Sequence, residues 1–163
     1  MKQLLLYLAA TAAFIILVGL LTTQNQKIKL VLPTSEFKTT STVKIGETTV
    51  DVKVANTADT RKKGLSGVKS LGANQGLLFV FEANDSKPIF WMKDMNIAID
   101  MIWIANQKVV QIDADVPAPA PGTADKDLKL YPAHQPVEYV LEVNAGFAEE
   151  RGIAVGDSFE FKP

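Results

Sequence analysis

Two carboxylates lie inside segments that otherwise have the composition of apolar β-strands. Asp100 falls within the apolar segment 97–104, and Glu142 falls within the segment 137–144. Because residues in a strand alternate between two faces, each carboxylate shares its own face with apolar neighbours. A buried carboxylate is costly unless it is paired or hydrogen-bonded, so each is expected to have a partner.

Two cations are placed to act as partners. Arg61 belongs to a short predicted helix that ends near Gly64, and Lys93 directly follows the predicted strand 89–92. We therefore predict a polar cluster that could receive a ligand. Its candidate ligand-binding residues are Arg61, Trp91, Lys93, Asp94, Asp100, Glu142 and Asn144.

Three interpretations of this cluster stay open, and no catalytic residue is assigned. It could bind a small polar ligand such as a saccharide or an anion. Alternatively, Asp100 and Glu142 could act as the acid and base of a hydrolase. The charges could also only tie strands together in a structural or partner-docking domain. The sequence favours a binding or accessory module over an enzyme.

The sequence gives simpler predictions for the two tryptophans and the histidine. Trp103 lies in an apolar strand and is expected in the core, as is Trp91, although an exposed Trp91 could line a sugar site. His134 lies between two prolines, where an imidazole is poorly held for catalysis. We expect it to be a solvated loop residue.

Composition excludes several classes of protein. The 163 residues include no cysteine, one histidine, and 17 basic against 18 acidic side chains, with a net charge of −1. Disulfides, thiolate metal sites and multi-histidine metal sites are therefore excluded. The charge balance offers no basic surface for nucleic acid. We expect no metal, no cofactor and no nucleic-acid partner.

The amino-terminal segment is strongly apolar. Residues 4–21 contain no charge and, as a helix, would extend roughly 27 Å, close to the thickness of the hydrocarbon core. We predict a membrane anchor or signal segment over 1–23 and a polar tether over 24–40. The short basic start favours a domain outside the cytoplasm, exported if the segment is cleaved. The lysines that follow the segment count against this orientation.

Residues 41–163 form the predicted domain. Alternating apolar residues predict a hairpin over 43–54, and further strands are expected at 76–81, 89–92, 97–104, 108–116, 137–144 and the carboxy terminus. Short helices are expected within 57–72 and near 145–152. The fold class is therefore α+β and β-rich, with a small barrel-like or folded mixed sheet after an N-terminal transmembrane helix. The proline-rich segment 117–136 is expected to be a loop of unassigned role.

Several motifs make the chain resemble a known family, the domain of unknown function 192, also called uncharacterised protein family 0127. They are Arg61 with 64–67, the strand 76–81, the stretch 90–95 with Asp100, and 139–146. The resemblance implies a compact β-rich domain, often exported or membrane-attached in bacteria and archaea, without an established activity. We therefore expect a membrane-anchored extracytoplasmic domain that meets a small polar ligand or another component of the envelope.

Overall fold

The computed structural model describes residues 37–81 and 86–162. The chain divides into two compact units, 1–33 and 34–163, and all the described residues belong to the second unit. The expected membrane segment 1–23 and most of the tether 24–40 lie outside the described residues. Within the described ranges, no helix is both long and apolar enough to cross a membrane.

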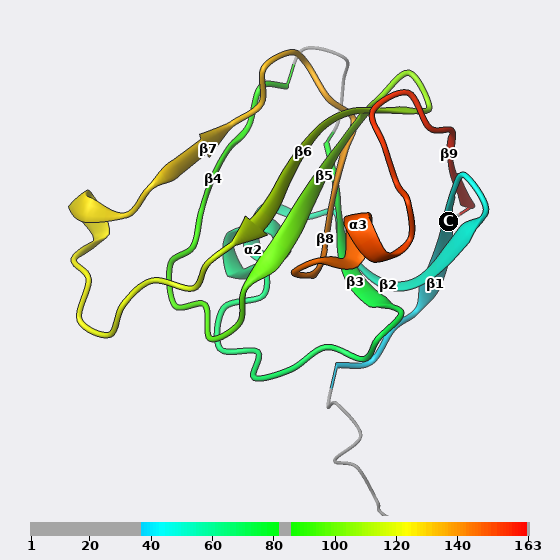
Figure 1. The fold of residues 1–163 in the computed structure, drawn as a ribbon. Helices are drawn as coiled ribbons and strands as arrows, with labels where there is room; N and C mark the ends of the chain where they lie inside the picture. Colours follow the sequence, from blue (N-terminus) through cyan, green and yellow to red (C-terminus); the bar gives the residue numbers. More distant parts are fainter. Residues whose placement is uncertain (1–36, 82–85, 163) are drawn as a thin grey trace, which may run out of the picture. The chain divides into compact units, whose positions relative to one another are not determined.

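A seven-stranded sheet forms the body of the domain (Figure 1). Its strands, in sheet order, are β6 (Lys108–Val116), β5 (Ile99–Ala105), β8 (Tyr139–Asn144), β3 (Gln75–Val80), β2 (Thr48–Ala55), β1 (Ser41–Ile45) and β9 (Phe159–Lys162). Neighbouring strands are antiparallel except for β2 and β3, which are parallel. The expected mixed sheet is thus confirmed.

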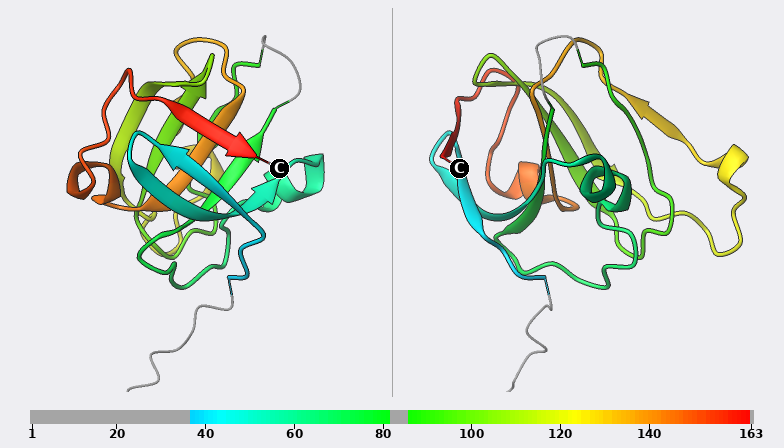
Figure 2. Two further views of the ribbon diagram at one scale, coloured as in Figure 1. Left: turned by 90° about the vertical axis from the view of Figure 1, so that its right-hand side faces the viewer. Right: turned by 180° about the vertical axis from the view of Figure 1, so that it is seen from behind.

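The sheet curls into a half-barrel, as the two turned views in Figure 2 show. A bridge between Lys108 and Ser158 brings the start of β6 close to the chain that leads into β9. The amide of Val109 donates to the carbonyl of Asp157 across the same gap, at 2.9 Å. These bonds occupy backbone groups at one corner of the two edge strands, which limits their exposure.

A second, two-stranded sheet pairs β4 (Ile89–Trp91) with β7 (Leu130–Pro132) and extends away from the main sheet (Figure 1). Strand β7 and the 3-10 helix η1 (Asp125–Asp127) lie in the segment 117–136, for which we expected no regular structure. That expectation was wrong for these residues. A three-residue strand paired with a distant segment leaves no periodic pattern in its own sequence.

Two short helices complete the domain, as expected. Helix α2 (Ala58–Lys63) begins at Thr57, whose side chain and that of Thr60 form a reciprocal capping box. It ends at Gly64, where φ is +49°. Helix α3 (Phe147–Glu150) buries Phe147 and Ala148 against the sheet.

Apolar side chains form two clusters, one on each face of the sheet. One cluster joins α3 to Ile102, Ile104 and Leu141, and we call this side the α3 face. The other joins Met101 and Trp103 to residues of β3 and the two-stranded sheet, and we call it the β4 face. Trp103 is fully buried, which confirms its expected place in the core.

Candidate functional site

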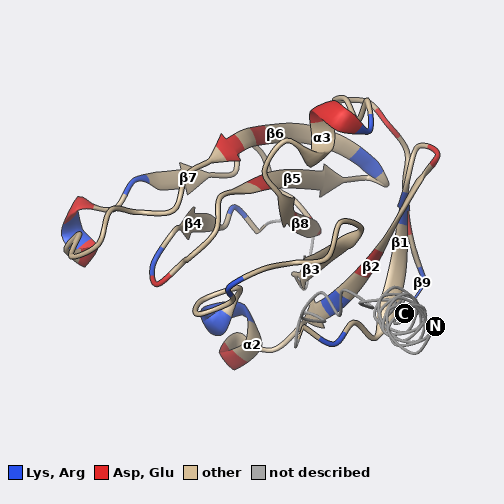
Figure 3. Ribbon diagram, turned by 60° about the horizontal axis from the view of Figure 1, so that its bottom comes forward, with Lys and Arg blue, Asp and Glu red and all other residues tan. Residues whose placement is uncertain are grey.

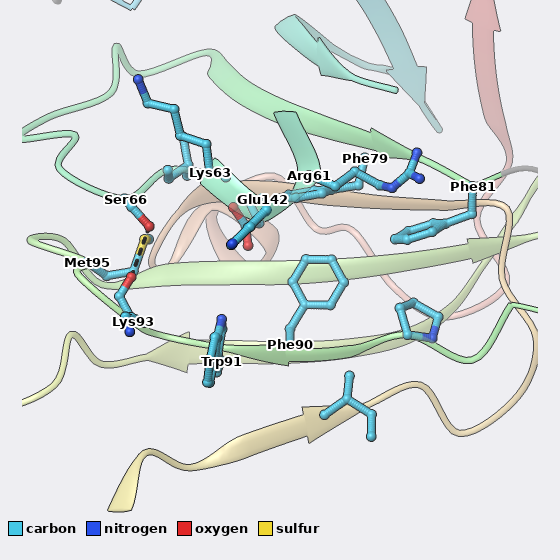
Figure 4. Close-up of a pocket in the computed structure, with 15 residues that line it drawn as sticks. Arg61, Lys63, Ser66, Phe79, Phe81, Phe90, Trp91, Lys93, Met95 and Glu142 are labelled. Atoms are coloured by element: carbon cyan, nitrogen blue, oxygen red, sulfur yellow. Dashed lines mark hydrogen bonds between the residues drawn. The ribbon is translucent and has the colours of Figure 1, made fainter. Parts of the chain in front are cut away.

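A cleft opens on the β4 face between α2, the loop that follows it, and β4 (Figure 4). Its volume is about 320 Å³, at the lower end of the range of small-molecule sites. Phenylalanines from β3, from the position just after β3 and from β4 form its walls, together with Trp91. Its polar lining residues are Arg61, Lys62, Lys63, Ser66, Lys93 and Glu142.

Glu142 is the buried acid of this cleft. Its backbone pairs with Leu77 on β3 and Met101 on β5, and residues directly opposite in a sheet point to the same face. The side chain is only 4% exposed, and Oε2 makes no hydrogen bond within the described part of the chain. Burial raises the pKa of Glu142 to about 8, because desolvation disfavours the charged form. At neutral pH the group is therefore mostly protonated.

The position of Glu142 depends on a glycine in the neighbouring strand. A Cβ at Gly76 would lie 2.7 Å from the carbonyl oxygen of Glu142, closer than real Cβ contacts. Gly76 thus lets β3 and β8 approach each other at this point. The strands that carry the cleft floor are held at a spacing that a larger residue at this position would prevent.

Asp100 is fully buried on the opposite face, and backbone amides satisfy it. Oδ1 accepts from the amides of Asp115 at 2.8 Å and Gly146 at 3.1 Å, while Oδ2 accepts from Ala148 at 2.8 Å. Asp115 has φ of +51° beside a register shift between β5 and β6. The cationic partner that we expected for Asp100 is therefore wrong, and Asp100 instead fixes a β-bulge and the start of α3.

The Asp100 and Glu142 side chains lie on opposite faces of the sheet. Glu142 pairs with Met101 on β5, so Asp100, one residue before Met101, points to the other face of the sheet. A hydrolase that uses Asp100 and Glu142 as acid and base needs both carboxyl groups against one substrate. The observed register does not provide that arrangement.

Arg61 and Lys93 both line the cleft, but neither forms an ion pair with Glu142. One Arg61 nitrogen, Nη1, donates to the carbonyls of Asn56 and Val80, each at 3.0 Å. Lys93 forms an ion pair with Asp125, and this hydrogen bond raises the pKa of Lys93 above its ordinary value. Its Nζ also lies 5.6 Å from the centre of the Trp91 ring.

The remaining candidates fall into different places. Trp91 is 47% exposed and lines the cleft, so its expected place in the core was wrong. Asn144 donates to the carbonyl of Gly72 at 3.0 Å, and Asp94 has φ of +58°, with its carbonyl accepting from Gly67. Both lie outside the cleft lining. His134 is exposed, as expected.

Sequence reasoning missed most of the aromatic wall. Phe79 and Phe90 meet edge to face, with ring centres 4.8 Å apart, and Phe90 also contacts Trp103 at 5.3 Å. Arg61 lies 5.5 Å from the centre of the Phe81 ring. Phe79, Phe90 and Trp103 come from separate strands, so only the arrangement of those strands would have revealed that they share one surface.

The fold and the cleft define a small domain with a curled, mostly antiparallel sheet and a lateral pocket. At the floor of this pocket lies a carboxyl oxygen without a partner among the described residues. The chain belongs to the DUF192 family, described as "Uncharacterized ACR", whose model matches residues 40–161. No curated protein matches the chain.

Two solved structures share the fold. One is a protein of unknown function from Novosphingobium aromaticivorans, with 28% identity and a TM-score of 0.64, covering 73% of this chain and 83% of that one. The other, from Sinorhizobium meliloti, is provisionally described as a transcription regulator. It has 26% identity and a TM-score of 0.65, covering 74% of this chain and 92% of that one.

Proposed function

We propose that the domain is a binding or accessory module that receives a small polar ligand, a saccharide or an anion, in the cleft between α2 and β4. The observation that carries the proposal is Glu142, whose Oε2 is buried at the cleft floor without a partner in the described part of the chain. A buried polar atom left unsatisfied destabilises the fold by about 1–3 kcal/mol. A ligand that bonds to this atom would recover that energy.

The wall of the cleft supports the same proposal. Trp91 is a large aromatic side chain that stays 47% exposed instead of joining the core. Aromatic faces beside polar groups bind the carbon skeletons of small ligands, while the polar groups fix their orientation. The cleft offers both kinds of contact within one cavity of about 320 Å³.

We also propose that residues 4–21 anchor the protein in a membrane and hold the domain outside the cytoplasm, where the ligand would be a component of the envelope. The support is the uncharged and predominantly apolar run in the sequence. Sodium carbonate washing of membranes tests the anchor, since a spanning segment stays in the pellet. Protease treatment of intact cells tests on which side of the membrane the domain lies, because an extracytoplasmic domain is digested without lysis.

A thermal-shift screen of the full chain in detergent tests the ligand site. Saccharides, carboxylates and phosphate esters are added singly, and a ligand that binds only the folded state raises the Tm. We expect at least one compound to raise it. A screen without any shift would contradict the proposal and leave the structural or partner-docking interpretation.

Two matched variants locate the binding. Trp91 and Leu130 are opposite each other in the two-stranded sheet, and both are exposed, but Leu130 lies outside the cleft lining. Trp91→Ala is expected to reduce the ligand-induced shift, whereas Leu130→Ala leaves it unchanged. Equal loss in both variants would place the ligand elsewhere.

A further inference from the structure

The cleft carries a surplus of positive charge. Arg61, Lys62, Lys63 and Lys93 line it, and Glu142 is the one acid among its described lining residues. Figure 3 shows the basic positions on α2. Lys62 and Lys63 form no ion pair with any other described residue. Since the whole chain has a net charge of −1, this concentration of cations is a local feature.

Glu142 does not offset these cations. No described cation lies within ion-pair distance of its carboxyl group, and the side chain is only 4% exposed. A desolvated and unpaired carboxylate takes up a proton, and burial raises the pKa of Glu142 to about 8. The neutral carboxyl group has one O–H donor. At neutral pH the cleft floor therefore presents a donor.

The cationic side chains of the cleft are also donors. Lysine and arginine side chains have no acceptor atom. The Ser66 hydroxyl donates to the carbonyl of Lys93 at 3.0 Å, so toward a ligand it can only accept. A ligand that satisfies the neutral Glu142 carboxyl group and the cationic side chains must bring acceptors. A cationic ligand would instead meet Arg61, Lys62 and Lys63, which form no ion pair with any described carboxylate, whereas Lys93 is paired with Asp125.

The geometry points to a small organic anion as the ligand, an inference that rests on the proposed function of the cleft. A charged oxygen of the ligand accepts a hydrogen bond from the neutral Glu142 carboxyl group, and the cations around the cleft balance its charge. Carboxylates and phosphate esters share this chemistry. The exposed Trp91 ring contacts the carbon skeleton, and the cavity suits a molecule the size of a sugar acid or a sugar phosphate.

Soaking crystals of the full chain in different salts tests whether the cleft binds anions or cations. Crystals at pH 7 are soaked in sodium bromide or in rubidium chloride, and anomalous scattering locates each ion. We expect bromide within hydrogen-bond distance of Glu142 Oε2 and no rubidium in the cleft. Rubidium at Glu142 would overturn the inference that the ligand is an anion. The proposal that the cleft binds a ligand would still stand. Bromide only at exposed lysines, an adventitious ion only, or no ion in the cleft also overturns the inference.

Two substitutions at Glu142 distinguish the contribution of its hydrogen-bond donor from that of the shape of the cavity. Glu142→Gln keeps a hydrogen-bond donor, and the bromide site is expected to persist. Glu142→Leu fills a similar volume without a donor and is expected to lose the site. Because replacing a buried polar group by an apolar one of similar volume is tolerated, the leucine variant is expected to fold. Bromide at unchanged occupancy in the leucine variant would exclude the carboxyl group as the donor.

A thermal-shift comparison of the full chain in detergent extends the test to organic ligands. D-glucuronate and D-glucose differ in one carboxylate, and D-glucose 6-phosphate adds a phosphate ester, each at matched ionic strength. We expect at least one anion to raise the Tm more than glucose, and the stronger of the two identifies the type of anion. If glucose raises the Tm as much as both anions, the anion inference fails while the polar-ligand site is supported. If none raises it, and no compound in the wider screen does, both proposals fail.

Discussion

Two buried carboxyl groups on neighbouring strands have opposite surroundings. On the α3 face, Asp100 accepts hydrogen bonds from the amides of Asp115, Gly146 and Ala148. On the β4 face, Glu142 has an oxygen with no partner among the described residues, at the floor of a cleft. The two side chains are 0% and 4% exposed. Burial alone therefore does not show whether the fold supplies hydrogen-bond partners to a carboxyl group.

The difference lies in what supplies the partner. Backbone amides are fixed by the strands and by α3, so Asp100 is satisfied as soon as the fold forms. Glu142 faces phenylalanines and the side chains of cations that do not reach it. No described residue supplies a hydrogen-bond partner for its Oε2 atom. We therefore assign Asp100 to stability and propose Glu142 as a contact of the ligand.

Removing Asp100 is expected to have the largest effect on stability. Asp100→Ala leaves three amides without their acceptor and is expected to lower the free energy of unfolding by about 3–5 kcal/mol. Urea denaturation measures the loss. Asp100→Asn keeps one acceptor oxygen and is expected to lose less. A loss below about 1 kcal/mol for the alanine variant would mean that these bonds do not hold the bulge and α3 together.

Glu142 is expected to make stability depend on pH with the opposite sign to an ordinary ion-paired carboxylate. Its pKa rises from 4.5 to about 8 on folding, so the folded state holds a proton that the unfolded state releases. Its contribution is present in full below pH 4.5 and is lost as the pH rises toward 8. At about 1.36 kcal/mol per pH unit, the loss reaches up to about 3 kcal/mol by about pH 7.

Glu142→Gln removes this titration and provides the control. The free energy of unfolding of the wild type is expected to fall relative to that of the glutamine variant between pH 4.5 and 8. Urea denaturation across this range measures the difference. Parallel curves for the two proteins would show that Glu142 titrates at an ordinary pKa.

Arg61 is expected to have a smaller structural role. Arg61→Met keeps most of the apolar stem but loses the bonds to the carbonyls of Asn56 and Val80, at an expected loss of about 1–2 kcal/mol. Lys62→Met is the control, because Lys62 is exposed in the same helix. Its free energy of unfolding is expected to change by less than about 0.5 kcal/mol. Equal losses would show that the Arg61 bonds add no stability.

Trp91 is expected to have a smaller effect on folding than Asp100, Glu142 or Arg61. Because its side chain is 47% exposed, Trp91→Ala is expected to lower the free energy of unfolding by less than about 1 kcal/mol. Thermal unfolding without ligand measures this change. A loss comparable to that of Asp100→Ala would assign Trp91 to the core and weaken the functional interpretation of the cleft.

The local elements could be predicted from the sequence, because alternation marks β1 and β2, apolar segments mark β3 and β5, and Thr57 and Gly64 delimit α2. Alternation also indicated that Asp100 and Glu142 are buried. It could not show that they face opposite sides, since that depends on the pairing of Asp100 with Val143 and of Met101 with Glu142. Nor could it reveal β7, whose pairing with β4 joins distant segments.

The candidate site could be predicted only in part, because the sequence shows the local elements but not how the strands pair. The structure brings Arg61, Trp91, Lys93 and Glu142 to one cleft. Three other candidates lie outside that cleft, namely Asp94, Asp100 and Asn144. Charged residues beside apolar strands were visible in the sequence, whereas the partner of each one was not. Backbone amides cannot be identified as partners until strand register and turn geometry are known.

The protonation state of Glu142 tests the central claim most directly. Carbon-13 NMR of the full chain, with the glutamate carboxyl carbons labelled and Glu142→Gln used to assign the signal, follows the group through a pH titration. We predict a protonated carboxyl group at neutral pH that titrates at a pKa of about 8. Titration near pH 4.5, its ordinary value, would show that Glu142 is a solvated or paired carboxylate, and the contrast between Glu142 and Asp100 would be wrong.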